Sequence, residues 1–360
     1  RSANKSASMS SSFLAAAAAR AADGPVLATS SGAASPKVTV LSEKMAFLAA
    51  ADFWDKESGA PLLRRNANFL VANEPLSDAL HERLKRWPEL CGADSSDTQV
   101  AEEGCDDEAA LRIFLRDAER TFRDAGHQTR MIALLKRVWP ENKDYHQGLG
   151  YIASLLMLLF DEDTAVSILL RLTRDERYTP GYWKAAPDAY VRDAMVYSRL
   201  IEERHPQVHS LLARACVVPE AYASKWFIGL CIHVLPFAAL FDFVEAFLAE
   251  GFLFLFKFSI AIVAATSGRL LEYQPTDVNK ILEVLRLDVG LYPDDYEDGV
   301  FFSRLVADAK AVHLEKEQVL SLREEEGERL AEKMRKARER EAALAAESDD
   351  EIVFSDEEDD

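Results

Sequence analysis

The sequence predicts an all-α fold, and the spacing of its apolar residues carries most of that prediction. Between residues 39 and 300 these residues recur at steps of three and four, which places them on one face of a helix. Runs of alternating β-branched residues are rare, and no Asn-Gly or Asp-Gly hairpin signal separates two such runs. Apolar residues make up 49% of the 360-residue chain, which is enough to bury a large core.

The charge and the cysteine content limit the classes of function and the compartment that fit this chain. The formal net charge is −19, which argues against a nucleic-acid-binding surface, because phosphate contacts need a basic footprint. Nine acids and no base lie within Glu347–Asp360. Ser348 and Ser355 precede acids there, so this tail is either a target of acidophilic kinases or a solubilising extension. The four cysteines form no Cys-x-x-Cys pair, which is typical of thiols in a reducing compartment and indicates a cytoplasmic protein.

The chain divides into four predicted parts. Ser/Ala/Gly-rich sequence gives way to periodic apolar sequence near residue 38. After the last apolar helix comes a mixture of Glu, Arg, Lys, Leu and Ala with weak heptad character, which is typical of a solvated helix. The parts are a disordered N-terminal tail at 1–38, a helical domain at 39–300, a charged helix or short coiled coil at 301–347 and a disordered acidic tail at 348–360.

The first predicted helices precede a polar loop. Thr39–Trp54 carries apolar residues at helical spacing. A second helix is predicted over Leu76–Trp87, where Pro88 should stop it. The acidic stretch Gly92–Asp107 is typical of a surface loop.

The next helix is predicted over Glu108–Asp124, after Asp106 or Asp107, either of which is a suitable N-cap. Successive helical residues are 100° apart, so Arg120 lies about 180° from Leu111 and therefore opposite the apolar face. The predicted apolar face consists of Leu111, Phe114, Leu115, Ala118 and Phe122.

Glycine and proline set the remaining boundaries. Gly126 is expected to end the preceding helix, and Pro140 to end one over Thr129–Val138. The loop Glu141–Asp144 follows. Trp226–Thr266 is apolar but interrupted by charged residues, so buried helices are expected there rather than a membrane span. Further helices are predicted over Gly150–Phe160, Asp163–Thr173, Ala189–Glu203, Val208–Ala215, Ala223–Leu235, Ala238–Glu250, Leu253–Ala265 and Asp277–Arg286.

Two polar motifs lie beside these apolar runs, about one helix apart. The first is Phe114–Thr121, which contains Arg120, and the second is Tyr145–Gly148, which contains Gln147. GTP hydrolysis needs one group to neutralise charge on the phosphates and another to orient the attacking water, and an arginine and a glutamine can supply them. The chain has no GxxxxGK[ST] or GxGxxG motif and no cluster with metal-ligand spacing, so it is expected to hold no nucleotide or metal of its own.

These motifs resemble those of TBC domains, the GTPase-activating domains for Rab proteins. Phe114-x-x-Asp117-x-x-Arg120-Thr121 is similar to that family's IxxDxxRT motif, and Tyr145-x-Gln147-Gly148 is similar to its YxQG motif. Together with weaker matches, the ordered set covers roughly Pro75 to Leu287. The weaker matches are Arg83-x-x-x-Trp87 to R-x-x-x-W, Ser224-Lys225-Trp226-Phe227 to S-x-W-F, Leu235-Pro236 to l-P, Phe241-Asp242 to W-D and Glu250-Gly251 to e-G.

The resemblance implies a multi-helix domain with a groove for a small GTPase. Arg120 would enter the active site of a GTP-bound Rab as an arginine finger, and Gln147 would orient the attacking water in place of the GTPase's own glutamine. The protein would be an activator in trans and not itself an enzyme, because GTP and Mg²⁺ arrive with the Rab. It would regulate vesicle traffic from the cytoplasm or on endomembranes, without a transmembrane segment. Supporting roles would fall to Asp117, Thr121, Tyr145, Gly148 and Trp226.

Four positions depart from the family pattern. Phe114 replaces the usual isoleucine, and Arg123 replaces a frequent proline. Asp144 stands where a glycine usually precedes the tyrosine, and Gly150 where an asparagine is common; both bear on how the Gln147 loop is held. Two alternatives stay open: a catalytically inactive TBC-type scaffold or effector that binds a Rab or another partner, and a helical adaptor whose motif matches are accidental.

Overall fold

The computed structural model describes residues 76–93, 105–292 and 300–350, and every regular element within these ranges is a helix. The predicted all-α class is therefore confirmed. The helix predicted over Thr39–Trp54 and the predicted N-terminal tail lie outside the described residues.

The first helices along the chain carry both polar motifs. Asp107 caps the helix of the first motif, and its carboxylate accepts hydrogen bonds from the amides of Ala109 at 2.8 Å and Ala110 at 3.0 Å. Such a cap satisfies amides that the first turn leaves unpaired. These helices are α3 (Leu76–Cys91), α4 (Glu108–Thr121), α5 (Ala125–Asn142), α6 (Gln147–Leu159) and α7 (Glu162–Arg174).

Three boundaries predicted from glycine and proline are wrong. Pro88 lies inside α3 and Pro140 inside α5, each close to the C-terminal end of its helix. A proline there removes one amide but leaves the hydrogen bonds of the last residues intact. Gly126 does not end α4, because Asp124 starts a new helix by accepting the amide hydrogen of His127 at 2.9 Å.

The later helices contain the longest apolar runs. The helix predicted over Ala223–Leu235 is only one turn long, because Leu230 and Cys231 adopt left-handed φ angles of 45° and 55°, which a continuing α-helix does not permit. These elements are α8 (Asp188–Arg204), α9 (Pro206–Arg214), η4 (Pro219–Ala221), α10 (Ser224–Phe227), α11 (Phe237–Glu250), α12 (Phe252–Leu270), α13 (Val278–Leu285), η5 (Val289–Leu291), α15 (Val300–Ala311) and α16 (Lys316–Asp350).

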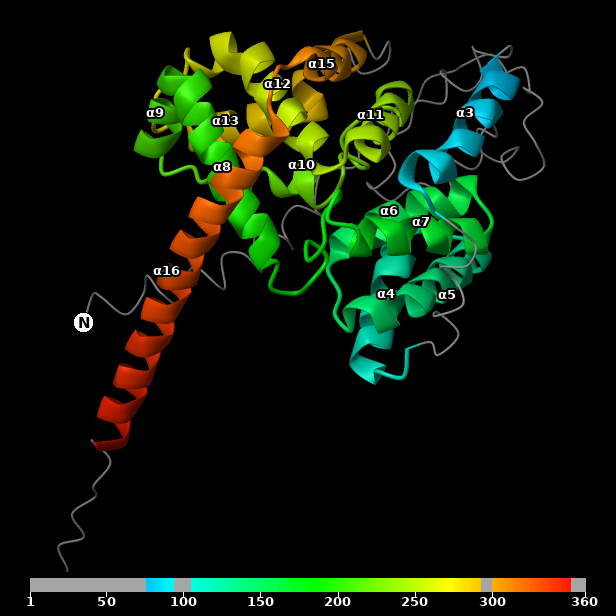
Figure 1. Ribbon diagram of the computed structural model, residues 1–360, viewed down its shortest axis with the longest axis horizontal. Coiled ribbons are helices and arrows are strands. Elements are labelled where there is room, and N and C mark those ends of the chain that lie inside the picture. The colour runs from blue at the N-terminus through cyan, green and yellow to red at the C-terminus, as the bar shows by residue number, and fades with distance from the viewer. Residues whose placement is uncertain (1–75, 94–104, 293–299, 351–360) are drawn as a thin grey trace, which may run out of the picture.

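The two sets of helices share one hydrophobic core. In Figure 1, α4–α7 gather on one side of the molecule and α8, α9, α12 and α13 on the other. Among the described residues, α12 is the one helix whose length and composition would allow it to cross a membrane, and 61% of its apolar window is buried inside the protein. Phe252, Phe254 and Phe256 on α12 are at most 2% exposed, which confirms the predicted burial for this part of Trp226–Thr266.

Two of the weaker motif matches meet in space where α3 packs on α11. Arg83 forms ion pairs with Asp242 at 2.5 Å and Glu245 at 2.8 Å. The indole N–H of Trp87, one turn later, donates to Glu245 at 3.3 Å. The polar side chains of these two motifs therefore connect residues about 160 positions apart in the sequence. The contact links α3, in the first set of helices, to α11, in the second.

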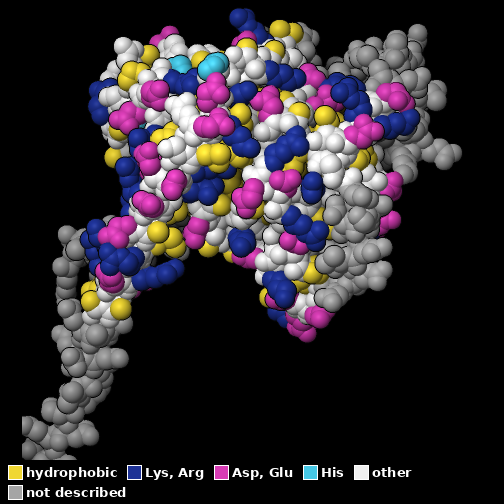
Figure 2. All heavy atoms as spheres, in the orientation of Figure 1, with side chains coloured by type: hydrophobic (Ala, Val, Ile, Leu, Met, Phe, Trp, Pro, Cys, Tyr) yellow, Lys and Arg dark blue, Asp and Glu magenta, His cyan; other side chains and the backbone are white. Residues whose placement is uncertain are grey.

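The predicted charged segment forms two helices, the core helix α15 and the long helix α16, and α16 has two different halves. Val319 is fully buried and Glu326 is 1% exposed, because the first half packs on α8. The sequence pattern did not predict that packing. Beyond Met334 every side chain described is exposed, and this half projects from the molecule with charged side chains along it (Figures 1 and 2).

Candidate functional site

Arg120 lies in the last turn of α4 with 64% of its side chain exposed. Its guanidinium is 3.7 Å from the carboxylate of Asp117, one turn earlier. The buried face of α4 is rotated from the predicted one toward Asp117, because Ala110 and Thr121 are buried whereas Leu115 is 47% exposed. Arg120 still points away from that face, so its guanidinium can be reached from outside.

Asp117 connects the two motifs. It is 6% exposed, and its second carboxylate oxygen accepts a hydrogen bond from the Tyr145 hydroxyl at 2.8 Å. Burial raises the pKa of Asp117 above its usual range, while the hydrogen bond from Tyr145 and the charge of Arg120 act to lower it. Thr121, also buried, donates its hydroxyl proton to the backbone oxygen of Asp117. The helix of Arg120 and the segment of Gln147 are thus joined by a buried hydrogen bond.

Gln147 is the first residue of α6 rather than part of a loop, because the helix begins three residues before the predicted start. Its side chain is half-buried, and its amide makes no hydrogen bond to any residue that the structure describes. His146 caps the helix, since its Nδ1 accepts the amide hydrogen of Gly148 at 3.0 Å. Burial lowers the pKa of His146 to about 4, which keeps that acceptor nitrogen unprotonated at neutral pH.

Two glycines allow close packing around the start of α6. A Cβ on Gly148 would lie 2.3 Å from Cγ2 of Ile228 and 2.8 Å from its backbone oxygen. A Cβ on Gly150 would lie 2.5 Å from the Tyr145 hydroxyl oxygen. Both distances are far below van der Waals contact, so neither position accommodates a side chain without movement. The glycine at 150, which departs from the family pattern, makes room for the hydroxyl group that bonds Asp117.

Asp144 holds the start of the second motif from the other side. Its carboxylate accepts the amide hydrogens of Tyr145 at 2.8 Å and of Ala185 at 2.9 Å. Trp183 belongs to the same segment as Ala185 and donates its indole N–H to the backbone oxygen of Ile228 at 3.1 Å. Asp144 stands out in the sequence as a departure from the family pattern, whereas no local motif marks Trp183, Ala185 or Ile228.

Trp226 lies in the core of the second set of helices. It is fully buried, with its ring against Tyr197 at 6.0 Å and Tyr222 at 5.4 Å. Ile228, two residues later in the chain, lies against Gly148 at the start of α6.

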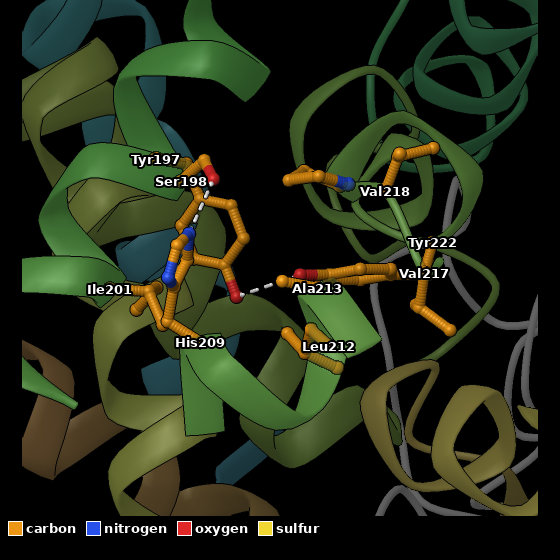
Figure 3. A pocket seen from close by; sticks show the side chains of 10 residues that line it. Tyr197, Ser198, Ile201, His209, Leu212, Ala213, Val217, Val218 and Tyr222 are labelled. Atoms are coloured by element: carbon orange, nitrogen blue, oxygen red, sulfur yellow. Dashed lines mark hydrogen bonds between the residues drawn. The ribbon is translucent and has the colours of Figure 1, made fainter. Parts of the chain in front are cut away.

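The structure also has a cavity of about 150 Å³ between α8, α9 and η4, shown in Figure 3. Tyr197 and Tyr222 form one part of its wall, and Ser198 and His209 face each other at 3.5 Å. None of the residues predicted for the site lines this cavity. No group of three or more His, Cys, Asp or Glu residues with metal-binding geometry exists within the described residues.

Comparison with known proteins gives a consistent family. Residues 69–271, more than half of the chain, match the Rab-GTPase-TBC domain family. Carabin from Mus musculus is 27% identical over 239 residues, which cover 62% of this chain and 53% of Carabin. The GTPase-activating protein GYP5 from Eremothecium gossypii is 24% identical over 143 residues, which cover 39% of this chain and 17% of GYP5. The chain thus spans about half of Carabin and a smaller part of GYP5.

A solved structure shows the same fold. The Chlamydomonas flagellar RabGAP TBC domain superposes with a TM-score of 0.51 at 17% sequence identity, over 66% of this chain and 83% of that domain. At this identity the likeness concerns the fold alone.

Proposed function

The chain belongs to the Rab-GTPase-TBC domain family, and on this premise we propose that it activates GTP hydrolysis by a Rab-family GTPase in its GTP-bound state. It would act in trans, by completing the active site of the GTPase, and would regulate vesicle traffic from the cytoplasm or on endomembranes. GTP and Mg²⁺ would be the partner's, so the chain needs no cofactor of its own.

Arg120 is the group proposed to act on the phosphates. Its side chain is exposed at the end of α4, and the one ion pair that the structure gives it, with Asp117, is long. A guanidinium held this loosely can leave its carboxylate for the stronger charge on the transferring phosphoryl group. An arginine finger of this kind contributes about 10³–10⁵ to the rate of hydrolysis.

Gln147 is proposed to orient the attacking water. Its amide offers a donor and an acceptor, and both are free of hydrogen bonds to the described residues. Its backbone is fixed by the His146 cap, by the contact of Gly148 with Ile228 and by the bond from Tyr145 to Asp117. Placing a water by a fixed group lowers the entropy cost of reaching the transition state.

The observation that carries the proposal is the buried Tyr145–Asp117 hydrogen bond, because it ties the Arg120 helix to the Gln147 segment. The test is GTP hydrolysis by a panel of GTP-loaded Rab proteins with and without the full chain. We expect at least one Rab to be strongly stimulated. Stimulation of none would overturn the proposal, and binding of a GTP-loaded Rab without stimulation would favour the inactive TBC-type scaffold.

A further inference from the structure

The C-terminal helix α16 is anchored by a buried ion pair. The Arg323 guanidinium donates to both carboxylate oxygens of Asp193 on α8, with the Nε bond at 2.9 Å, and stacks 3.6 Å above the ring of Phe252. Asp193 is fully buried and also accepts the hydroxyl hydrogen of Tyr182. A buried carboxylate needs such partners, because burial without them is costly.

Tyr182 belongs to residues 175–187, the connector between α7 and α8, and the residues next to it hold the Gln147 side of the site. Trp183 bonds the backbone oxygen of Ile228, which packs on Gly148. Ala185 bonds Asp144. Tyr182 therefore fixes the connector to α8 and, through Asp193, to α16. Trp183 and Ala185 fix it to the residues around the start of α6.

We propose that Arg323 is a positioning residue for Gln147, acting through Asp193 and the connector. The proposal rests on the proposed function and deepens it, because it assigns a catalytic consequence to a helix outside the family match at 69–271. Removal of Arg323 leaves Asp193 with Arg192, which is 2.8 Å away and 29% exposed. The carboxylate is then drawn toward the surface, and the Tyr182 hydroxyl group loses its fixed acceptor.

The chain provides a matched control for this change. Arg199 also joins α8 to α16, through ion pairs at 2.9 Å with Glu326, which is 1% exposed, and at 3.5 Å with Glu325. Removal of Arg199 leaves Glu326 with Arg329 at 3.0 Å, just as removal of Arg323 leaves Asp193 with another arginine. None of the hydrogen bonds or ion pairs of Arg199 involves the connector. Arg323→Met and Arg199→Met therefore loosen the same helix, and only the first one disturbs the connector.

The readouts are kcat and KM for hydrolysis by a GTP-loaded Rab that the full chain stimulates, with the Rab as the substrate. We expect Arg323→Met to lower kcat roughly tenfold with KM changed by less than about twofold, in the range seen for mutations that act through contact networks. Arg199→Met should leave both close to wild type, and Arg323→Lys should recover part of kcat because it keeps the charge. Equal kcat values for the two methionine variants would overturn the proposal.

Hydrogen exchange gives a readout that does not depend on the GTPase. In Arg323→Met, amides of 145–150 and 182–185 should exchange faster, while those of α4 stay as in wild type. Faster exchange throughout the chain would mean a general loss of stability and would overturn the proposal. If the wild type stimulates no Rab, the proposed function fails, and this exchange pattern still decides whether Arg323 holds the Gln147 segment.

A double-mutant cycle tests the route itself. Asp144→Ala removes one of the connector's two links to the site and leaves the bond from Trp183 to Ile228, whereas Arg323→Met loosens the connector from α16. If both act through the connector, the double variant should lose less kcat than the product of the two single losses, whereas independent effects would multiply. Multiplied effects would overturn the proposal. Should Arg323→Met fail to fold, Tyr182→Phe removes the same link at its next contact and replaces it in the cycle.

Discussion

Arg120 reaches solvent from the last turn of α4 with a long ion pair to Asp117, whereas Gln147 begins α6 within a shell of buried contacts. The α4 helix is packed on its neighbours and bonded to Tyr145, but the exposed Arg120 side chain itself is held loosely. The glutamine side is held at its backbone by residues from three other segments of the chain. Under the proposed function, the arginine adapts to the GTPase on binding, whereas the glutamine is placed before binding.

This difference fits the role proposed for each group. A charge can stabilise a phosphoryl group from several geometries, because electrostatic attraction falls off slowly with distance. A water must be held at one angle to attack in line, so its partner amide needs a fixed backbone. The predictions below separate the two sides, beginning with the largest expected effect.

Arg120→Ala removes the proposed phosphate-binding charge and should lower stimulated hydrolysis by about 10³-fold or more. Because the side chain is 64% exposed, the unfolding free energy should change by only about 0.5 kcal/mol. Single-turnover hydrolysis and denaturant titration measure the two quantities. Arg120→Lys keeps the charge but lacks the planar fork, so it should recover only part of the rate. Full activity of Arg120→Ala would exclude the arginine-finger role.

Gln147→Ala removes the water-orienting amide and should lower kcat by roughly 10²-fold, which is the cost expected for a misplaced reactant. The binding affinity for the GTP-loaded Rab should stay close to wild type, because the surrounding backbone contacts do not involve this side chain. Affinity from titration and kcat from hydrolysis are measured on the same preparation. A loss of affinity with unchanged kcat would assign Gln147 to docking instead of catalysis.

Gly148→Ala tests the backbone of the glutamine side without touching either proposed catalytic group. The added Cβ would meet Ile228 at 2.3 Å, so the start of α6 must shift, and we expect about 1–3 kcal/mol of destabilisation together with a lower kcat. Gly268→Ala on α12 is the matched control, since its Cβ would meet nothing within 4 Å. That change should stabilise by roughly 0.5–1 kcal/mol. Equal stability of the two variants would contradict the packing argument.

Much of the first set of helices could be predicted from local pattern, and so could the exposure of Arg120. Helical spacing located α4, α7, α8 and α11 closely, because an amphipathic face is a local property. The packing of Trp183 and Ile228 around Gly148 could not be predicted, since these residues are between 35 and 80 positions away from it and carry no motif. The burial of Asp117 was missed for the same reason: its partner, Tyr145, is 28 positions away.

His146 gives the smallest effect at neutral pH and a specific one in acid. Its pKa is about 4 in the folded protein against 6.5 for the unperturbed group, so between these values the unfolded chain binds a proton that the native state does not. Its contribution to stability is therefore complete above pH 6.5 and declines as the pH falls to 4, by up to roughly 3 kcal/mol. Protonation would also remove the Nδ1 acceptor that caps α6 and place a positive charge at a helix N-terminus.

The comparison with His146→Asn isolates this effect, because asparagine is a good N-cap and does not titrate. Other groups, such as Asp117 with its raised pKa, titrate in both proteins and cancel in the difference. Denaturant unfolding at pH 7.5, 6 and 5 should show a gap that is nearly constant above pH 6.5 and shifts in favour of the variant below it. A gap independent of pH would mean that His146 has the same pKa in the folded and the unfolded chain, which would contradict the lowered pKa.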